Sequence, residues 1–131
     1  MKRIIALFLV FLVLGTAVIG PQQMRVYTTT PATLSAPGYS AVTYCAGYNR
    51  LCWYFTIASI NTSVTIAIMA KKGSSAWTNI YANTVTYTAN GNYGIEWDKV
   101  ALADSVKFRF ISEVGGTAAT ITHNVALAGG N

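Results

Sequence analysis

The chain has 131 residues and a net charge of +5, with 10% charged and 53% hydrophobic side chains. This length predicts one domain together with a short N-terminal segment. The basic residues are scattered along the chain, so we expect no nucleic-acid partner. β-Branched and aromatic residues are abundant and carboxylates are few, which favours an all-β protein over a helical one.

Residues 1–20 form a basic and then apolar leader. Two basic residues precede the segment Ile4–Ile19, in which 14 of the 16 residues are apolar and which is expected to form one helix. This pattern is typical of a secretion signal, and the length of the apolar run also fits a retained membrane or assembly anchor. With either alternative, we expect the rest of the chain to be secreted or displayed on a cell or virion surface.

Residues 21–40 are rich in Thr, Pro, Ala and Ser, and they are expected to form a linker. Within this linker we expect one extended segment, made of Met24, Arg25, Val26, Tyr27 and Thr28. Pro31 and Pro37 confine such a strand to the edge of a sheet. The same segment is also a candidate donor strand that completes the sheet edge of a neighbouring copy.

The segment Val42–Ala70 predicts three strands. In each of them large apolar residues alternate with small or polar ones, the period of two expected for a strand with one buried face. The inward positions are Val42, Tyr44, Leu51, Trp53, Phe55, Ile57, Val64, Ile66 and Ile68.

Both cysteines lie in this central segment. Cys45 and Cys52 fall at positions opposite to the large apolar residues, and six residues stand between them. Two cysteines in an exported chain usually form a bond, so the sequence predicts a Cys45–Cys52 disulfide across a hairpin. No zinc site is expected, because the chain has no third cysteine and His123 is its single histidine.

The second half of the chain continues the alternating pattern. Further strands are predicted at Trp77–Tyr81, Val85–Tyr87, Tyr93–Trp97, Val106–Ile111 and Ala119–Val125. Asn90-Gly91 is the strongest hairpin signal, and Gly115-Gly116 predicts a turn. The small, Gly-rich residues 127–131 are expected to form a flexible tail.

Together these segments predict an antiparallel β-sandwich of the jelly-roll type. We expect about seven to nine short strands, and we place the sandwich domain at residues 41–126.

Candidate catalytic residues are few. Glu96 and Asp98 lie two residues apart, and paired carboxylates can act as a glycosidase acid and base or bind calcium. Neighbours on one strand face project in parallel and enclose no cleft, so a solvated face is the expected role. His123 shares the inward parity of Ile121, and no serine-hydrolase signature accompanies it. We therefore expect no enzyme activity, catalytic residue, metal or cofactor.

Two tyrosines are candidates for an exposed contact. Tyr48 lies in the turn between the cysteines, and Tyr54 lies on the polar face of its strand. Exposed aromatic side chains on a sandwich can stack on sugar rings or fill a subunit interface. We expect Tyr48 and Tyr54 to contact a glycan or another copy of the chain.

About half of the chain resembles a small sandwich module that occurs in phage and viral virion proteins and in exported prokaryotic surface proteins. The resemblance runs through Gly73–Trp77, Thr86–Tyr93, Val106–Phe110 and Gly115–Thr120. The chain departs from the usual pattern before Trp77, where Ser75-Ala76 stand in place of Asp-Gly. The resemblance implies a structural or adhesive role, and it transfers no functional residue.

These features favour a non-enzymatic exported subunit that self-assembles in a virion or in an extracellular filament or surface layer. Strand faces that are poor in charge suit packing against copies of the same chain, as a homo-oligomer. A membrane contact through residues 4–19 is a further expectation. The alternative is a secreted carbohydrate-binding module of the same fold.

Overall fold

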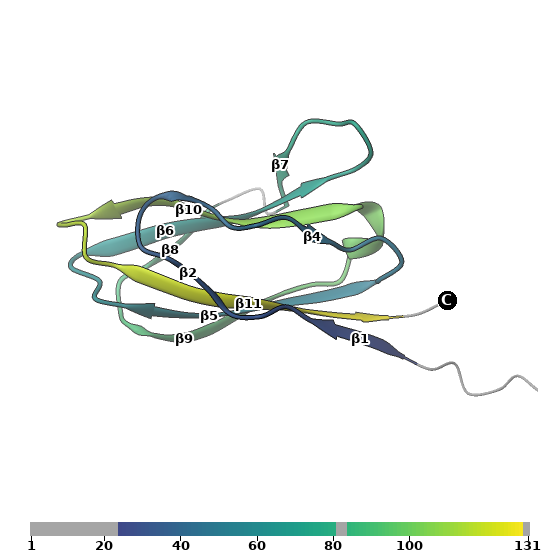
Figure 1. Cartoon of the computed structure of the whole chain (residues 1–131). Coiled ribbons are helices and arrows are strands. Elements are labelled where there is room, and N and C mark those ends of the chain that lie inside the picture. Colours follow the sequence, from purple (N-terminus) through teal and green to yellow (C-terminus); the bar gives the residue numbers. More distant parts are fainter. Residues whose placement is uncertain (1–23, 81–83, 130–131) are drawn as a thin grey trace, which may run out of the picture.

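The computed structural model describes residues 24–80 and 84–129, which form two antiparallel β-sheets packed face to face (Figure 1). The first, here called the β11 sheet, contains β1 (Arg25–Thr28), β2 (Ala32–Leu34), β5 (Arg50–Ala58), β9 (Gly91–Trp97) and β11 (Thr120–Gly129). The second, the β10 sheet, contains β3 (Gly38–Tyr39), β4 (Thr43–Tyr44), β6 (Ser63–Lys71), β7 (Thr78–Asn79), β8 (Val85–Tyr87) and β10 (Ser105–Val114). The predicted β-sandwich is confirmed.

Helix is nearly absent from the described part of the chain, where a short 3₁₀ turn, η1 (Val100–Leu102), is the one helical element. The helix predicted within residues 1–20 lies outside the described residues. Among the residues that the structure describes, no helix has the length and apolar character needed to cross a membrane.

Each sheet has four strand positions. The β11 sheet has the order β1-β11-β5-β9, and β2 shares with β1 the edge beside β11. The β10 sheet has the order β3-β10-β6-β7, in which β4 shares the edge of β3 and β8 shares the edge of β7. Most connections cross from one sheet to the other, so nearly all strand pairs join segments that are distant in sequence.

The core lies between the sheets and consists of the inward positions of the four long strands. Its largest fully buried side chains are Trp53, Phe108, Phe110, Ile57, Ile66, Ile68, Ile121 and Leu127. The outward neighbours on β5 are exposed or half-buried, which gives that strand the alternating pattern that the sequence predicts. Each fully buried aliphatic or aromatic side chain of this kind contributes about 1.5–3 kcal/mol through removal of apolar surface from water.

The Asn90-Gly91 pair does not form a hairpin. β8 pairs with β6 in the β10 sheet, whereas β9 begins at Gly91 and pairs with β5 in the β11 sheet. The connection therefore crosses between the sheets, and neither residue adopts the positive φ that a tight hairpin turn requires. Asn90 instead accepts a hydrogen bond from the backbone N–H of Ile60 at its Oδ1 atom, at 2.8 Å.

The sandwich is longer than predicted at both ends. Within residues 21–40, β1 and β2 pair with β11 and β3 pairs with β10, so this segment supplies sheet edges from Arg25 onward. At the other end, β11 continues to Gly129 with Leu127 fully buried, so residues 127–129 are strand and not a flexible tail. Of the three strands β1, β2 and β3, the sequence analysis predicts β1 as the edge segment 24–28 but neither β2 nor β3, because short edge strands with partly exposed faces carry little apolar alternation.

The inward and outward faces of the segment Val42–Cys45 are the reverse of those predicted. Val42 and Tyr44 are exposed, whereas Cys45 is fully buried in the core. The cause is the pairing of β4 with β10, which places Thr43 opposite the inward-facing Val106. Directly paired residues lie on the same face of a sheet, so Tyr44 must point outward.

Candidate functional site

The two cysteines are free thiols on opposite sides of the β11 sheet. Cys45 lies in the core between the sheets, whereas Cys52 lies on the outer face of β5. The predicted disulfide is therefore not formed in this structure. The prediction was wrong because it placed both residues on outward faces, and only Cys52 has that position.

The thiol of Cys45 is unreactive at neutral pH. Burial, followed by the negative charge of Asp104, raises the pKa of its thiol to about 11. The thiolate is the nucleophilic form of cysteine, so this residue stays protonated and unreactive at neutral pH. Its backbone N–H donates a hydrogen bond to the carbonyl oxygen of Asp104 at 2.9 Å, which fixes the chain at the end of β4.

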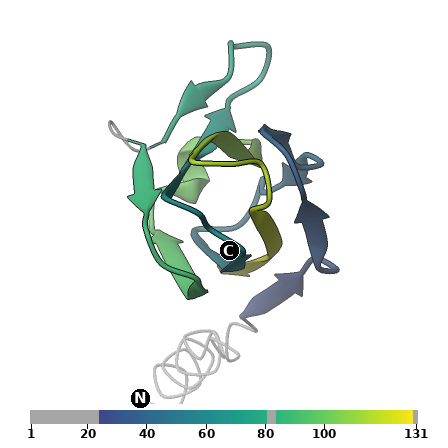
Figure 2. The ribbon, with the colours of Figure 1, turned by 90° about the vertical axis from the view of Figure 1, so that its left-hand side faces the viewer.

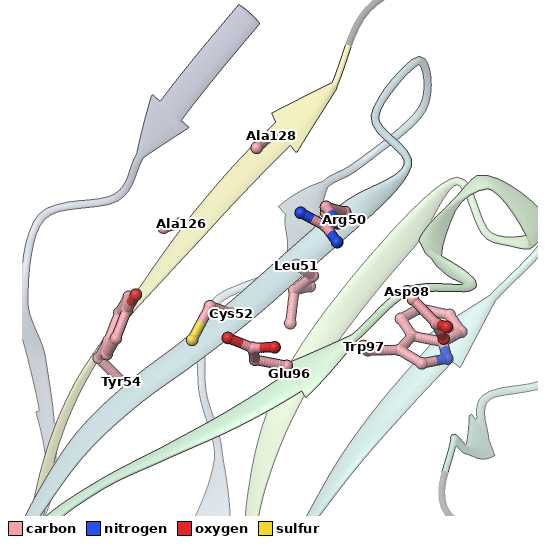
Figure 3. A pocket seen from close by; sticks show the side chains of 9 residues that line it. All are labelled: Arg50, Leu51, Cys52, Tyr54, Glu96, Trp97, Asp98, Ala126 and Ala128. Atoms are coloured by element: carbon pink, nitrogen blue, oxygen red, sulfur yellow. The ribbon is translucent and has the colours of Figure 1, made fainter. Parts of the chain in front are cut away.

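A groove of about 210 Å³ lies on the outer face of the β11 sheet (Figure 3). We call it the outer groove, and its lining residues are Arg50, Leu51, Cys52, Tyr54, Glu96, Trp97, Asp98, Ala126 and Ala128. The alanines of β11 make the groove hollow because their side chains are short, while β5 and β9 supply its polar side chains. Cys52 lies directly opposite Glu96 in the strand register.

Tyr54 interacts with the thiol of Cys52. Its side chain forms a hydrogen bond with Cys52, and this bond, the charge of Cys52, partial desolvation and the charge of Glu96 all raise the pKa of Tyr54. The phenol is therefore protonated at neutral pH and acts as a hydrogen-bonding group. With 49% of its surface exposed, Tyr54 lies where a partner molecule can reach it.

Glu96 and Asp98 both line the outer groove, together with Arg50. Both are exposed, as expected for a solvated face, but they line a hollow that the sequence analysis did not expect, because the short side chains of β11 leave space beside them. Nowhere in residues 24–80 and 84–129 do three or more His, Cys, Asp or Glu side chains gather as metal ligands.

The outer face of the β10 sheet carries a cluster of cations and aromatic rings that the sequence analysis missed. We call it the cationic face, and it consists of Tyr39, Lys71, Trp77, Lys107 and Arg109. The ammonium of Lys107 lies 4.0 Å from the ring centroid of Tyr39 and 4.4 Å from that of Trp77. The alternation of Lys107 and Arg109 along one strand was a sequence signal for a basic face. The aromatic rings come close to these cations only through tertiary structure, such as the pairing of β3 with β10.

The segment that carries the edge strands β1 to β4 runs along one side of the sandwich (Figures 1 and 2). Residues of this segment, with others of β11, line a second hollow of about 580 Å³. We call it the edge cleft, and it is lined by Tyr27, Thr29, Thr30, Pro31, Ala32, Ala41, Val42, Thr43, Tyr44, Tyr48, His123 and Val125. Among these described residues, none is an Asp, Glu, Lys or Arg. The cleft is thus an uncharged hollow with three tyrosines.

His123 is the buried polar group of the edge cleft. Its Nδ1 accepts a hydrogen bond from the indole Nε1–H of Trp53 at 3.2 Å, and its ring stacks on Phe108 with centroids 5.1 Å apart. Burial lowers the pKa of His123 below its usual value of 6.5, so the ring is neutral at pH 7. Because Nδ1 accepts, the proton of the neutral ring resides on Nε2.

The Nε2–H group of His123 is buried and has no hydrogen-bond partner among the described residues. A buried donor without a partner costs about 1–3 kcal/mol. Native proteins keep few such groups, and each one needs an explanation, such as an ordered water molecule or a ligand that accepts the hydrogen bond. The sequence analysis placed His123 on the inward face, but the free donor depends on the Trp53 contact and was not foreseen.

The structure places the two predicted contact tyrosines in different sites. Tyr48 lines the edge cleft, where it is half-buried and packs against the core, whereas Tyr54 lies in the outer groove. The predicted edge or donor segment 24–28 lies at the edge of the β11 sheet, paired with β11 of its own chain. Met24 and Val26 of this segment are exposed.

Comparison with known proteins gives a fold relationship only. No family model matches the chain, and no curated protein sequence matches it. Among solved structures, it is similar to the SPBc2 prophage-derived protein YomS, with a TM-score of 0.56 and 15% identity over 87% of this chain and 100% of YomS. A structure of infectious bursal disease virus, Gx strain, aligns with a TM-score of 0.46 and 12% identity over 81% of this chain and 33% of that chain.

Proposed function

We propose that the protein is a non-enzymatic, exported structural subunit that packs against copies of itself in a virion or in an extracellular filament or surface layer. Export would follow from the leader, with residues 4–19 as a cleaved signal or as a membrane or assembly anchor. The protein would then act at a cell or virion surface or after secretion.

The strand order supports a virion role. Two sheets of four strand positions, β1/β2-β11-β5-β9 and β3/β4-β10-β6-β7/β8, match the double Greek key of a jelly roll. Jelly rolls are widespread in viral capsid and lectin domains. The fold shared with a prophage-derived protein is consistent with a phage or viral setting, although one fold can serve many functions.

The observation that carries the proposal is the complementary charge of the two outer faces. Lys71, Lys107 and Arg109 form the cationic face of the β10 sheet. The outer groove of the β11 sheet presents two carboxylates, Glu96 and Asp98, and one cation, Arg50, so acidic side chains outnumber basic ones there. The β10 sheet of one copy can therefore dock on the β11 sheet of the next, and complementary potentials favour and orient such contacts.

Contact between two different faces has a consequence for the shape of the assembly. A head-to-tail interface leaves one free face at each end, so copies add until they close a ring or extend as a filament. The exposed apolar side chains at the edge of the β11 sheet, Met24 and Val26, add further surface for lateral contacts.

The experiment is to purify the full chain and follow its particle mass by light scattering over a range of concentrations, with negative-stain microscopy and intact mass on the same sample. We expect the mass to rise with concentration and ordered rings, fibres or shells to appear. The intact mass then tells whether the leader is retained in the assembly. A monodisperse monomer at high concentration, with the leader present and with it removed, would contradict the proposal.

A carbohydrate-binding module is the second candidate function, and the edge cleft favours it. Tyr27, Tyr44 and Tyr48 surround an uncharged hollow that is large enough for a small ligand. Screening of the full chain on a glycan array tests this candidate. Absence of binding to every glycan would remove it without affecting the assembly proposal.

A further inference from the structure

We propose that the edge cleft is a binding site for a neutral sugar ring, in which the Nε2–H of His123 donates a hydrogen bond to a ring or hydroxyl oxygen of the ligand. The inference deepens the second candidate function and rests on it. Self-assembly through the outer faces is independent of this inference, because no residue of the edge cleft belongs to the cationic face or to the outer groove.

The first argument is the buried donor. His123 is 6% exposed and lines the cleft, and its Nε2–H has no partner in the part of the chain that the structure describes. The bond from Trp53 to Nδ1 and the stack on Phe108 fix the ring, so the donor is held in place before any ligand arrives. Nε2 itself is buried, so a ligand oxygen reaches it only when side chains at the base of the cleft move aside; it then satisfies a group that the fold leaves without a partner.

The second argument is the chemistry of the lining. Threonines at positions 29, 30 and 43 supply hydroxyl groups, each of which can donate and accept hydrogen bonds. An anion or a cation would find no opposite charge among the described residues of the cleft. A ligand with several hydroxyls and no charge fits this lining, which is the character of a neutral sugar.

The third argument is the set of aromatic rings at the opening. Tyr27 and Tyr44 are exposed and Tyr48 is half-buried, so the rings line the cleft from its mouth inward. The face of an aromatic ring attracts the C–H groups of a flat sugar face, and the phenol hydroxyl remains available for the sugar hydroxyls. The cleft volume of about 580 Å³ lies within the range of ligand pockets.

The test begins with a glycan array probed with the labelled full chain, followed by titration of the strongest neutral glycan. Three variants are compared with the unchanged chain: Tyr44→Ala at the mouth, His123→Phe at the donor and Tyr54→Ala in the outer groove. Tyr54→Ala is the matched control, because it also removes an exposed tyrosine of the same β-sandwich.

We expect Tyr44→Ala to weaken binding about 3- to 10-fold through loss of a ring contact. His123→Phe keeps a flat ring but removes the donor, and we expect about tenfold or greater weakening. Tyr54→Ala should bind as the unchanged chain does. In nitrogen NMR spectra of the unchanged chain, the glycan should shift the Nε2 signal of His123, a direct readout that does not depend on the stability of any variant.

Four outcomes would overturn the inference. Binding that is lost in Tyr54→Ala and retained in Tyr44→Ala would place the sugar in the outer groove, so the second candidate function would survive without this site. Binding to charged glycans alone would contradict this site but not the second candidate function, whereas absence of binding to every glycan would contradict both. A change of particle mass in Tyr44→Ala, with no glycan bound and no Nε2 shift, would assign the cleft to another copy of the chain.

Discussion

At the residue scale, the reactivity of each titratable side chain depends on the face of the sheet that it occupies. Cys45 and Cys52 are close in sequence, yet one lies in the core and the other beside Tyr54 on the outer face. The sequence analysis assigned His123 to the inward face correctly. The bond that orients His123 joins it to Trp53 from another strand, so only tertiary structure reveals it.

The thiols give the first prediction. In the folded chain, a thiol reagent such as Ellman's reagent should modify Cys52 promptly and leave Cys45 unmodified, because burial raises the pKa of Cys45 to about 11 and shields its sulfur. In denaturant without reductant, both should react. Mass spectrometry after alkylation locates the labels, and Cys52→Ser is the control that should abolish labelling of the folded chain. Failure of both thiols to react in denaturant would reveal a disulfide and contradict the structure.

The second prediction concerns stability at acidic pH. Burial lowers the pKa of His123 from 6.5, so the unfolded chain binds a proton at a pH where the folded chain does not. The stability that this residue contributes is therefore complete above pH 6.5 and is lost progressively as the pH falls toward its lower folded pKa. Denaturant midpoints measured from pH 7.5 downward check this prediction. The midpoint should change less with pH in His123→Phe than in the unchanged chain.

A separate acid transition should follow at lower pH. The hydrogen bond from Lys72, and then that from the backbone of Gly73, lower the pKa of Asp104 below 3.8. The stability that Asp104 contributes is present above that value and is lost as the pH falls below it.

The prediction for His123 has its own contradicting outcome. An identical dependence of stability on pH in His123→Phe and in the unchanged chain between pH 7.5 and 4 would contradict the role given to His123.

At the element scale, the four long strands were predictable and the short ones only in part. β8 has the predicted bounds and β1 lies within the predicted segment 24–28, whereas β2 and β3 were not predicted. β5, β6, β10 and β11 each have a run of buried residues at alternate positions, and such a run survives in any β fold. The short strands at the sheet edges take their register from a neighbour and bury little of their own surface. The edge cleft lies between those short strands, and for this reason its residues did not stand out in the sequence.

The turn between β10 and β11 carries the third prediction. Gly115 has a φ of +91°, and a Cβ added there would overlap the side chain of Thr62. Gly115→Ala should therefore lower the free energy of unfolding by about 1–3 kcal/mol through backbone strain and steric overlap. Urea denaturation measures the loss.

The matched control is Gly73→Ala. Gly73 also has a positive φ, of +53°, but a Cβ at that position would meet no atom within 4 Å. Gly73→Ala should therefore lower the free energy of unfolding by only about 1 kcal/mol, close to the ordinary penalty for a non-glycine residue in the left-handed region. Equal losses in the two variants would mean that the contact with Thr62 has no effect on stability.

At the scale of the whole molecule, the two sheets present outer faces of different chemistry. Lys107 and Arg109 mark one face, and Glu96 and Asp98 mark the other. The composition alone indicated low charge and a β fold, and it could not show how the charges are divided between the sheets, with Lys107 and Arg109 on one face and Glu96 and Asp98 beside Arg50 on the other. That division follows from the strand order, which places β10 and β9 in different sheets.

Sedimentation velocity of paired charge-reversal variants tests head-to-tail assembly most directly. Lys107→Glu with Arg109→Glu should dissociate the assembly, as should Glu96→Lys with Asp98→Lys, because like charges then face each other across the contact. The chain that carries all four changes should assemble again, since the complementarity is restored with reversed sign. Lys99→Glu, an exposed change outside both faces, should sediment as the unchanged chain does. Assembly that persists in both double variants, or that is not restored in the fourfold variant, would contradict the account.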